Sequence, residues 1–363
     1  MSAPLLMIPG PTPVQPDVLD ALAEPVRSHT GAENAATMLR IQDGLRRLVG
    51  STSARVYVFA GSGTLAMEAA LVNHVAEGER VVVVSNGYFG DRFVEIAGAL
   101  GVHGQVVRAE WRTEVTADAL KALLVRARPS AVCITHVDTS TGVLASCEQL
   151  TLAVRAVAPE TLVLLDGVCA TGGIEQRMDE WDVDVVFTGA QKALGVPPGL
   201  ALLAVSERAR RRRASLPHVR AYYIDLQRWD ASVDDPRVYF STHATSLLRA
   251  LEQSLTDIDA EGLEHRFARH ETVAESLRHG MGELGFTPFT ERRSLAPTLS
   301  VLRAPDGVDE ARFRRRMADR GVIVAGCIGP WAGRGIRVGH MGAVGEVEVA
   351  RTIEAAQAAF TES

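Results

Sequence analysis

The chain has 363 residues, 47% of them hydrophobic and 23% charged, which is typical of a globular protein with one large and one small domain. Its net charge of −6 means that the protein as a whole has no positive field with which to hold nucleic acid. No apolar run reaches the ~18–20 residues that cross a bilayer. The first residues lack a basic segment and a cleavage pattern, and the four cysteines lack CxxC spacing. We therefore expect a cytoplasmic protein with no metal site and no disulfides.

Short β-rich runs alternate with helical patterns between about residues 54 and 205. Several runs are apolar at every position, as strands covered on both faces are. Helical stretches such as 64–76 and 90–101 separate them. The alternation predicts an α/β fold with a mainly parallel, seven-stranded sheet, and the expected strands are 56–60, 80–85, 102–108, 131–135, 162–166, 183–188 and 200–205. Ligands bind such sheets at the carboxyl ends of the strands, so the residues after each run are the candidates.

The rest of the chain predicts a smaller α+β domain. A helical stretch at 246–284 is followed by the pattern strand, helix, strand, strand, helix, at 298–302, 309–320, 322–324, 335–338 and from about 345. We divide the chain into an N-terminal arm near the candidate site, a large α/β domain and a small domain, at 1–20, 21–255 and 256–363. The arginine-rich run at 208–213 is interpreted as a solvated helix face, because no aromatic residues interleave with it.

The scarcity of lysine draws attention to Lys192. Only two of the 38 basic residues are lysines, and Lys121 lies in an amphipathic helical pattern typical of the surface. Lys192 instead follows an apolar run, in a loop of small residues. Burial there would lower its pKa and leave its amine nucleophilic, which suits Schiff-base chemistry.

Two other strand ends carry polar residues with a possible role in ligand binding. Ser62, Gly63 and Thr64 join a strand to a helix, where backbone N–H groups can hold a phosphate, although a tight turn capped by Ser62 explains the segment equally well. The segment lacks the GxGxxG spacing and the Walker lysine, which argues against NAD and ATP. Asp166 ends another run, either as a turn residue or as the partner of a cation.

A Schiff-base lysine, a strand-end acid and a phosphate cradle together are the groups that pyridoxal 5'-phosphate (PLP) requires. The acid would keep the pyridine nitrogen of PLP protonated, so that the ring can accept electrons. The sequence therefore indicates a PLP site at one edge of the sheet.

The chain resembles the class V aminotransferases of PLP fold type I, closest to the alanine–glyoxylate and serine–pyruvate group. The resemblance runs from Pro9-Gly10-Pro11 to residues 335–342, and its most specific block is GAQKALGVPPG at 189–199. It implies a ping-pong enzyme that moves an amino group from a small amino acid to a 2-oxo acid such as glyoxylate or pyruvate. It also implies a homodimer with shared active sites.

The resemblance implies two catalytic residues and a set of cofactor contacts. Lys192 would form the Schiff base and move the substrate proton, and Asp166 would pair with the pyridine nitrogen. The remaining cofactor-binding residues that it implies are Ser62, Gly63, Thr64, Phe89, Ser140, Val168, Gln191, Tyr239 and Thr242. Of these, Tyr239 and Thr242 would reach the phosphate from the partner subunit, and an ordinary core role for Phe89 stays open.

The resemblance also implies substrate contacts. Arg337 would bind the α-carboxylate, because a guanidinium can pair with both carboxylate oxygens. Gly10 and Ile8 would lie near the substrate, and Ile8 stands where relatives often have glycine, so it could narrow the pocket. His29 and Glu33 lie in a segment that lines the neighbouring subunit's active site in relatives, and Trp331 would form part of the pocket wall. We take these three as candidate specificity residues, with a surface-loop role as the alternative for His29 and Glu33.

Other functions stay open at this point. A PLP-dependent lyase or cysteine desulfurase would use Cys327, the cysteine placed near Arg337. A specialised class V transaminase would act on a phosphonate or ureido amino acid. The presence of Lys192 and Asp166 argues against a non-catalytic binding protein on the same scaffold. The missing GxGxxG pattern argues against a dinucleotide enzyme.

Overall fold

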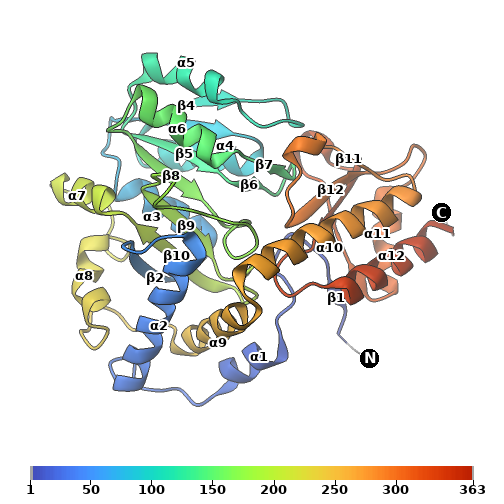
Figure 1. Cartoon of the computed structure of the whole chain (residues 1–363), viewed down its shortest axis with the longest axis horizontal. Helices are drawn as coiled ribbons and strands as arrows, with labels where there is room; N and C mark the ends of the chain where they lie inside the picture. Colours follow the sequence, from blue (N-terminus) through green and yellow to red (C-terminus); the bar gives the residue numbers. More distant parts are fainter. Residues whose placement is uncertain (1–2, 362–363) are drawn as a thin grey trace.

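The computed structural model describes residues 3–361, and a seven-stranded sheet forms the centre of its larger part (Figure 1). The strands are β2 (Arg55–Gly61), β3 (Arg80–Ser85), β4 (His103–Arg108), β5 (Ala131–Thr135), β8 (Leu162–Asp166), β9 (Val185–Gly189) and β10 (Gly199–Val205). Their order is β2-β10-β9-β8-β5-β3-β4, with β10 antiparallel to both neighbours and every other pair parallel. The predicted mainly parallel sheet of seven strands is confirmed.

Helices cover both faces of this sheet, which is why its strands are apolar at nearly every position. Along β3, Val82 and Val84 join one apolar core, and Val81 and Val83 join the other. The first core includes residues of α1 (Pro16–Ala23), α2 (Ala32–Val49), α5 (Ala117–Ala127), α6 (Cys147–Val157) and α9 (Thr245–Glu261). The second includes residues of α3 (Gly63–Val72), α4 (Tyr88–Ala99), α7 (Glu207–Ser215) and α8 (Leu226–Asp234).

A smaller, antiparallel sheet forms the rest of the molecule, as predicted for an α+β part (Figure 1). Its order is β11-β12-β15-β14, and the strands are β11 (Thr287–Pro288), β12 (Leu299–Arg303), β14 (Ala325–Gly326) and β15 (Gly335–Gly339). Its apolar core is shared with α10 (Leu263–Glu283), α11 (Glu310–Asp319) and α12 (Glu346–Thr361).

The stretch predicted to be helical at 246–284 is helical and consists of two helices, α9 and α10. Gly262 lies between α9 and α10 with φ +80°, a conformation outside the helical region that glycine adopts without steric cost. Helix α9 runs across the boundary that we expected at residue 255 and ends at this glycine.

The N-terminal segment connects the smaller sheet to the larger one. Strand β1 (Leu5–Leu6) pairs in parallel with β13 (Val322–Ile323), and the backbone N–H of Gly339 donates to the carbonyl of Met7 at 3.0 Å. Five residues later, the N–H of Thr12 donates to the carbonyl of Gln191 at 3.1 Å, in the loop after β9. The arm therefore lies against both parts of the molecule.

The arginine-rich run at 208–213 lies in α7, as expected for a helix. The interpretation of the whole run as a solvated face is wrong for Arg213, which is buried and pairs with Asp225 at 2.7 Å. Arg211 is largely exposed, as predicted. The run thus serves partly to fix α7 to its neighbours.

Of the helices in residues 3–361, none combines the length and the apolar character that a membrane crossing requires. Within the same range, no group of three or more His, Cys, Asp or Glu side chains is arranged to hold a metal ion. All four cysteines are free and buried.

Candidate active site

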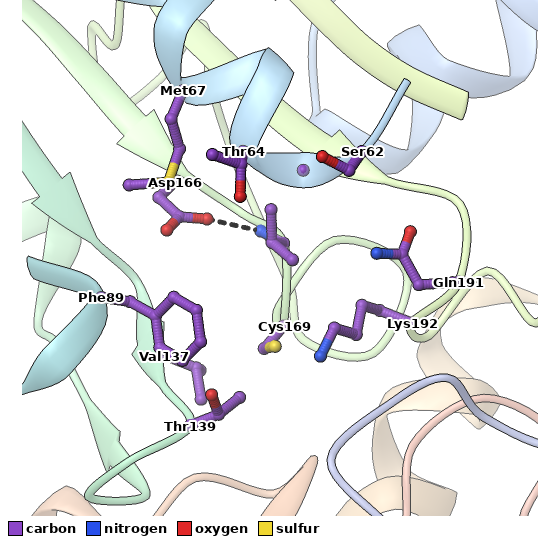
Figure 2. Close-up of a pocket in the computed structure, with 12 residues that line it drawn as sticks. Ser62, Thr64, Met67, Phe89, Val137, Thr139, Asp166, Cys169, Gln191 and Lys192 are labelled. Carbon is purple, nitrogen blue, oxygen red and sulfur yellow. Dashed lines mark hydrogen bonds between the residues drawn. The ribbon is translucent and has the colours of Figure 1, made fainter. Parts of the chain in front are cut away.

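The carboxyl ends of β2, β8 and β9 meet at one edge of the large sheet and open onto a pocket with a cavity volume of about 150 Å³ (Figure 2). The pocket is lined by Ser62, Gly63, Thr64, Met67, Phe89, Val137, Thr139, Asp166, Val168, Cys169, Gln191 and Lys192. Eight of these are residues that the sequence singled out. The strand-end argument therefore locates this pocket, because parallel strands bring their loops to the same edge.

Lys192 lies in the loop after β9 and extends its amine into the pocket (Figure 2). Its Nζ donates a hydrogen bond to the carbonyl of Pro9, in the N-terminal arm. The backbone at Gly10 has φ +122°, and a Cβ there would lie 2.6 Å from both Cδ and Nζ of Lys192. Gly10, which we expected near the substrate, is thus packed directly on the lysine, and only a glycine leaves the amine room.

Asp166 is the last residue of β8 and is only 4% exposed. One carboxylate oxygen accepts a hydrogen bond from the backbone N–H of Val168 at 2.9 Å (Figure 2). No other donor to this carboxylate is found among the described residues. Burial raises the pKa of Asp166 to about 7, although the nearby Lys192 lowers it. The hydrogen bond from Val168 is what we expected of a turn residue. The carboxylate can still accept a hydrogen bond from a cationic N–H of a ligand bound in the pocket.

The turn from β2 into α3 presents unpaired backbone donors to the pocket. Ser62 is the N-cap residue of α3, but its side chain makes no capping bond, which disfavours the simple capped turn. The N–H groups at the start of a helix have no partner within the helix and attract anions. The side-chain oxygen of Gln191, buried at the same pocket, also has no partner in residues 3–361. This end of the pocket can hold a phosphate.

Phe89 lies in the first turn of α4 and is half-buried on the pocket wall, rather than in the core (Figure 2). Its backbone N–H donates to the fully buried carboxylate of Asp138 at 2.9 Å, and the N–H of Gly90 donates to the same oxygen at 3.2 Å. Asp138 therefore caps α4 and holds the aromatic ring at the pocket.

Ser140, which the resemblance implied as a cofactor contact, is not among the residues that line the pocket. Its hydroxyl donates to Asp138 at 2.5 Å and accepts from the backbone N–H of Tyr88 at 2.9 Å, and the residue is fully buried. The preceding residue, Thr139, faces the pocket instead. The turn at 138–142 therefore lies at the pocket, and its conformation decides which of its residues faces the pocket.

Pocket residues that the sequence reasoning missed are Met67, Val137, Thr139 and Cys169. Met67 lies one turn into α3, and the others lie shortly after the predicted strand ends, so a wider search around those ends would have found them. Cys169 and Val137 also belong to an apolar cluster behind the pocket.

Arg337, on β15, lies at the edge of this region with a half-buried guanidinium. It donates to the carbonyl of Gly326 at 2.8 Å and to the carbonyl of Thr139 at 3.3 Å. No carboxylate in the described part of the chain pairs with it. Burial lowers its pKa, and a charged, half-buried guanidinium bonded only to carbonyls is suited to a ligand carboxylate.

The residues that we assigned to the partner subunit's site do not reach the pocket of their own chain. His29 packs edge-on against Tyr239, with 5.3 Å between the ring centroids, and Tyr239 is 63% exposed. Thr242 is close to Tyr239 in the chain and does not line the pocket either. Glu33 pairs with Arg27 at 2.8 Å on the surface.

Three further candidates also lie outside the pocket lining. Ile8 directs its backbone carbonyl at Gly339, where a Cβ would lie only 2.1 Å away. Trp331 is buried and stacks on Phe289, with 4.2 Å between the ring centroids. Cys327 is buried, which raises its thiol pKa to about 12 and disfavours the thiolate that a desulfurase would need.

Comparison with known proteins gives consistent matches. A family model described as class-V aminotransferase matches residues 6–329. The chain is 35% identical over 364 residues to a Synechococcus protein named as the small subunit of a soluble hydrogenase, covering 99% of this chain and 93% of that one. It is 31% identical over 353 residues to the alanine–glyoxylate aminotransferase of Drosophila melanogaster, covering 94% and 88%. A crystal structure of a Nostoc alanine–glyoxylate aminotransferase matches with a TM-score of 0.95 at 31% identity, covering 99% and 96%.

The raised pKa of Asp166 predicts a pH dependence of stability in the cofactor-free protein. The unfolded chain releases this proton near the ordinary pKa of 3.8 and the folded chain near 7, so the stability of the folded state falls as pH rises between these values. Asp166→Asn removes this effect. In urea unfolding, the free energy of unfolding of the variant, relative to that of the wild type, should increase by about 2–3 kcal/mol from about pH 5 to pH 8. An equal difference at both pH values would contradict the raised pKa.

Proposed function

Because the chain belongs to the class-V aminotransferase family, we propose that it is a PLP-dependent transaminase acting on a small, alanine- or serine-like amino acid and a 2-oxo acid such as glyoxylate or pyruvate. The observation that carries the proposal is the pocket that brings the amine of Lys192 together with the buried carboxylate of Asp166. The reaction would follow a ping-pong cycle, in which the 2-oxo acid formed from the first amino acid leaves before the second 2-oxo acid binds.

The pocket offers groups suited to the pyridine nitrogen, the phosphate and the ring of PLP, and the proposal assigns them as follows. Asp166 would pair with the protonated pyridine nitrogen, which would restore the charge that burial disfavours. The turn at Ser62, Gly63 and Thr64 would hold the phosphate with Gln191. Phe89 and Val168 would pack against the ring. When bound, PLP supplies an electron sink for the bonds at the Cα of the amino acid.

The chain's own groups would orient the substrate and move its proton. Arg337 would bind the α-carboxylate, with its guanidinium oriented by the carbonyls of Gly326 and Thr139. Lys192 would hold the cofactor covalently, and its Nζ, once freed by the incoming amine, would accept the proton from the Cα and return it. The carbonyl of Pro9 would orient that nitrogen.

A small, uncharged substrate side chain is supported by the composition of the pocket wall. The lining residues that are not assigned to the cofactor are Met67, Val137, Thr139 and Cys169, which offer thioether, hydroxyl, thiol and methyl groups. A second carboxylate on the substrate would find no further cation among the residues that line the pocket. Alanine and serine meet this constraint.

We further propose a cytoplasmic homodimer with shared active sites, in which Tyr239, Thr242 and His29 contact the partner's pocket. The support is that Tyr239 is exposed and packs on His29 away from its own pocket, at a surface that also exposes Tyr222 and Val238. The free cysteines suit a reducing compartment. The proposal keeps the division into an arm at 1–20, a large domain at 21–255 and a small domain at 256–363.

The two lysines of the chain allow a matched test of the proposed covalent link. Borohydride reduction of the PLP-loaded protein, followed by peptide mass mapping, should place the cofactor on Lys192 and leave Lys121 unmodified. Lys192→Ala should lower transamination of alanine with glyoxylate at least ~100-fold, because it removes the group that moves the proton. Lys121→Ala should retain wild-type turnover, since Lys121 lies outside the pocket lining and its ion-pair partner in residues 3–361 is Asp118, at 3.6 Å. Label on Lys121 alone, or full turnover without Lys192, would overturn the proposal.

Gly10→Ala tests whether the arm controls the position of the lysine. The new methyl would lie 2.6 Å from Nζ on a backbone with φ +122°, so we expect turnover to fall at least ~10-fold through a displaced amine. Gly98→Ala is the control, because a Cβ there meets nothing within 4 Å, and it should leave turnover unchanged. Wild-type turnover in Gly10→Ala would show that the amine does not depend on this contact.

A further inference from the structure

Three consecutive backbone carbonyls of the loop that carries Lys192 are each bonded by a side chain from a different element. The carbonyl of Lys192 accepts from the Thr12 hydroxyl at 2.8 Å, in the N-terminal arm. The carbonyl of Ala193 accepts from Nη2 of Arg266 at 2.6 Å, from α10. The carbonyl of Leu194 accepts from the hydroxyl of Ser254, from α9. The loop is therefore held from three directions.

Arg266 differs from the other two because it also bonds the loop that follows Asp166. Its Nε donates to the carbonyl of Gly172 at 2.6 Å. The two loops touch at this point, since Gly172 has φ +81° and a Cβ there would lie 3.2 Å from the side chain of Leu194. One guanidinium thus bonds the backbone of both loops that carry the proposed catalytic groups.

The surroundings of Arg266 fix the orientation of that guanidinium. The residue lies in the first turns of α10 and is only 5% exposed. Its Nη1 pairs with Glu261 at 2.7 Å, so each of its three nitrogens has a partner in a different direction. Because the guanidinium is planar and rigid, it holds the carbonyls of Gly172 and Ala193 at one separation.

We propose that Arg266 is a positioning residue that fixes the loop of Lys192 relative to the loop of Asp166. The inference rests on the proposed function, in which PLP is bound by Lys192 at one end and by Asp166 at the other. A rigid ring held at both ends binds well only if the separation of its two attachment groups is already set before it arrives. Arg266 touches neither cofactor nor substrate and would act only through this spacing.

Arg269 offers a matched control on the same helix. It also pairs with Glu261, at 2.6 Å, and it also donates to two backbone carbonyls, those of Val344 at 2.7 Å and Gly342 at 3.0 Å. Neither carbonyl belongs to the two loops that carry Lys192 and Asp166. A comparison of the two arginines therefore separates positioning of the site from general support of the fold.

The test measures how the full-length holoenzyme retains PLP on serial dilution, in wild type, Arg266→Gln and Arg269→Gln. We expect Arg266→Gln to raise the dissociation constant at least tenfold, about 1.4 kcal/mol, and Arg269→Gln to stay within about twofold of wild type. The midpoint of the pH titration of the bound cofactor's visible absorption should move in Arg266→Gln and stay at the wild-type value in Arg269→Gln. Loss of fold support alone would not change this midpoint.

Arg266→Lys separates geometry from charge. Lysine keeps the positive charge beside Glu261 but has no fork to bond both carbonyls, so we expect it to resemble Arg266→Gln. Wild-type affinity and midpoint in Arg266→Lys would overturn the proposal, as would equal behaviour of Arg266→Gln and Arg269→Gln. Where Arg266→Gln fails to fold, Arg266→Lys decides alone. Failure of the wild type to bind PLP would instead contradict the proposed function.

Discussion

The organisation of this site depends on the burial of one carboxylate. Asp166 ends β8 between β5 and β9, and the sheet and its covering helices leave it almost no contact with water. A buried carboxylate with one hydrogen-bond donor is costly to ionise, and a cationic N–H placed opposite offsets that cost. The same interaction would keep the pyridine nitrogen of PLP protonated. The carboxylate and the cofactor would therefore each stabilise the charged form of the other.

The amine of Lys192, the second group of the proposed reaction, lies in the loop after β9, the strand next to β8, and is bonded by the N-terminal arm. The N-terminal arm, which begins as β1 paired with β13, passes over the loop of Lys192 with its backbone at Pro9 and Gly10. Close backbone approach at Gly339 keeps the arm against β15, the strand that carries Arg337. The amine and the proposed carboxylate-binding group are thus tied to one short segment of chain.

Much of this fold could be predicted because the strands of a sheet covered by helices on both faces are apolar runs that end at polar or small residues. Three of the predicted strands, 80–85, 131–135 and 162–166, match β3, β5 and β8 residue for residue. Lys192 and Asp166 could be predicted for a related reason, since each follows or ends such a run and lysine is scarce in this chain. Patterns of this kind report local burial, and local burial was enough to place the pocket.

What could not be predicted depends on contacts between distant parts of the chain. The choice between Thr139 and Ser140 at the pocket is made by Asp138 and by the start of α4, about fifty residues earlier. Arg266 looks like any other arginine of an exposed helix until α10 is packed against both loops. The sequence predicted a helical stretch at 246–284 without its division at Gly262, because one glycine inside a helical pattern does not by itself end a helix.

The protonation state of the bound cofactor tests the central role of Asp166 most directly. PLP labelled with ¹⁵N at the pyridine nitrogen can be bound to the wild type and to Asp166→Asn, and the nitrogen chemical shift measured at about pH 8. The account predicts a protonated nitrogen in the wild type and an unprotonated one in the variant. An unprotonated nitrogen in the wild type, or the same shift in both proteins, would contradict it.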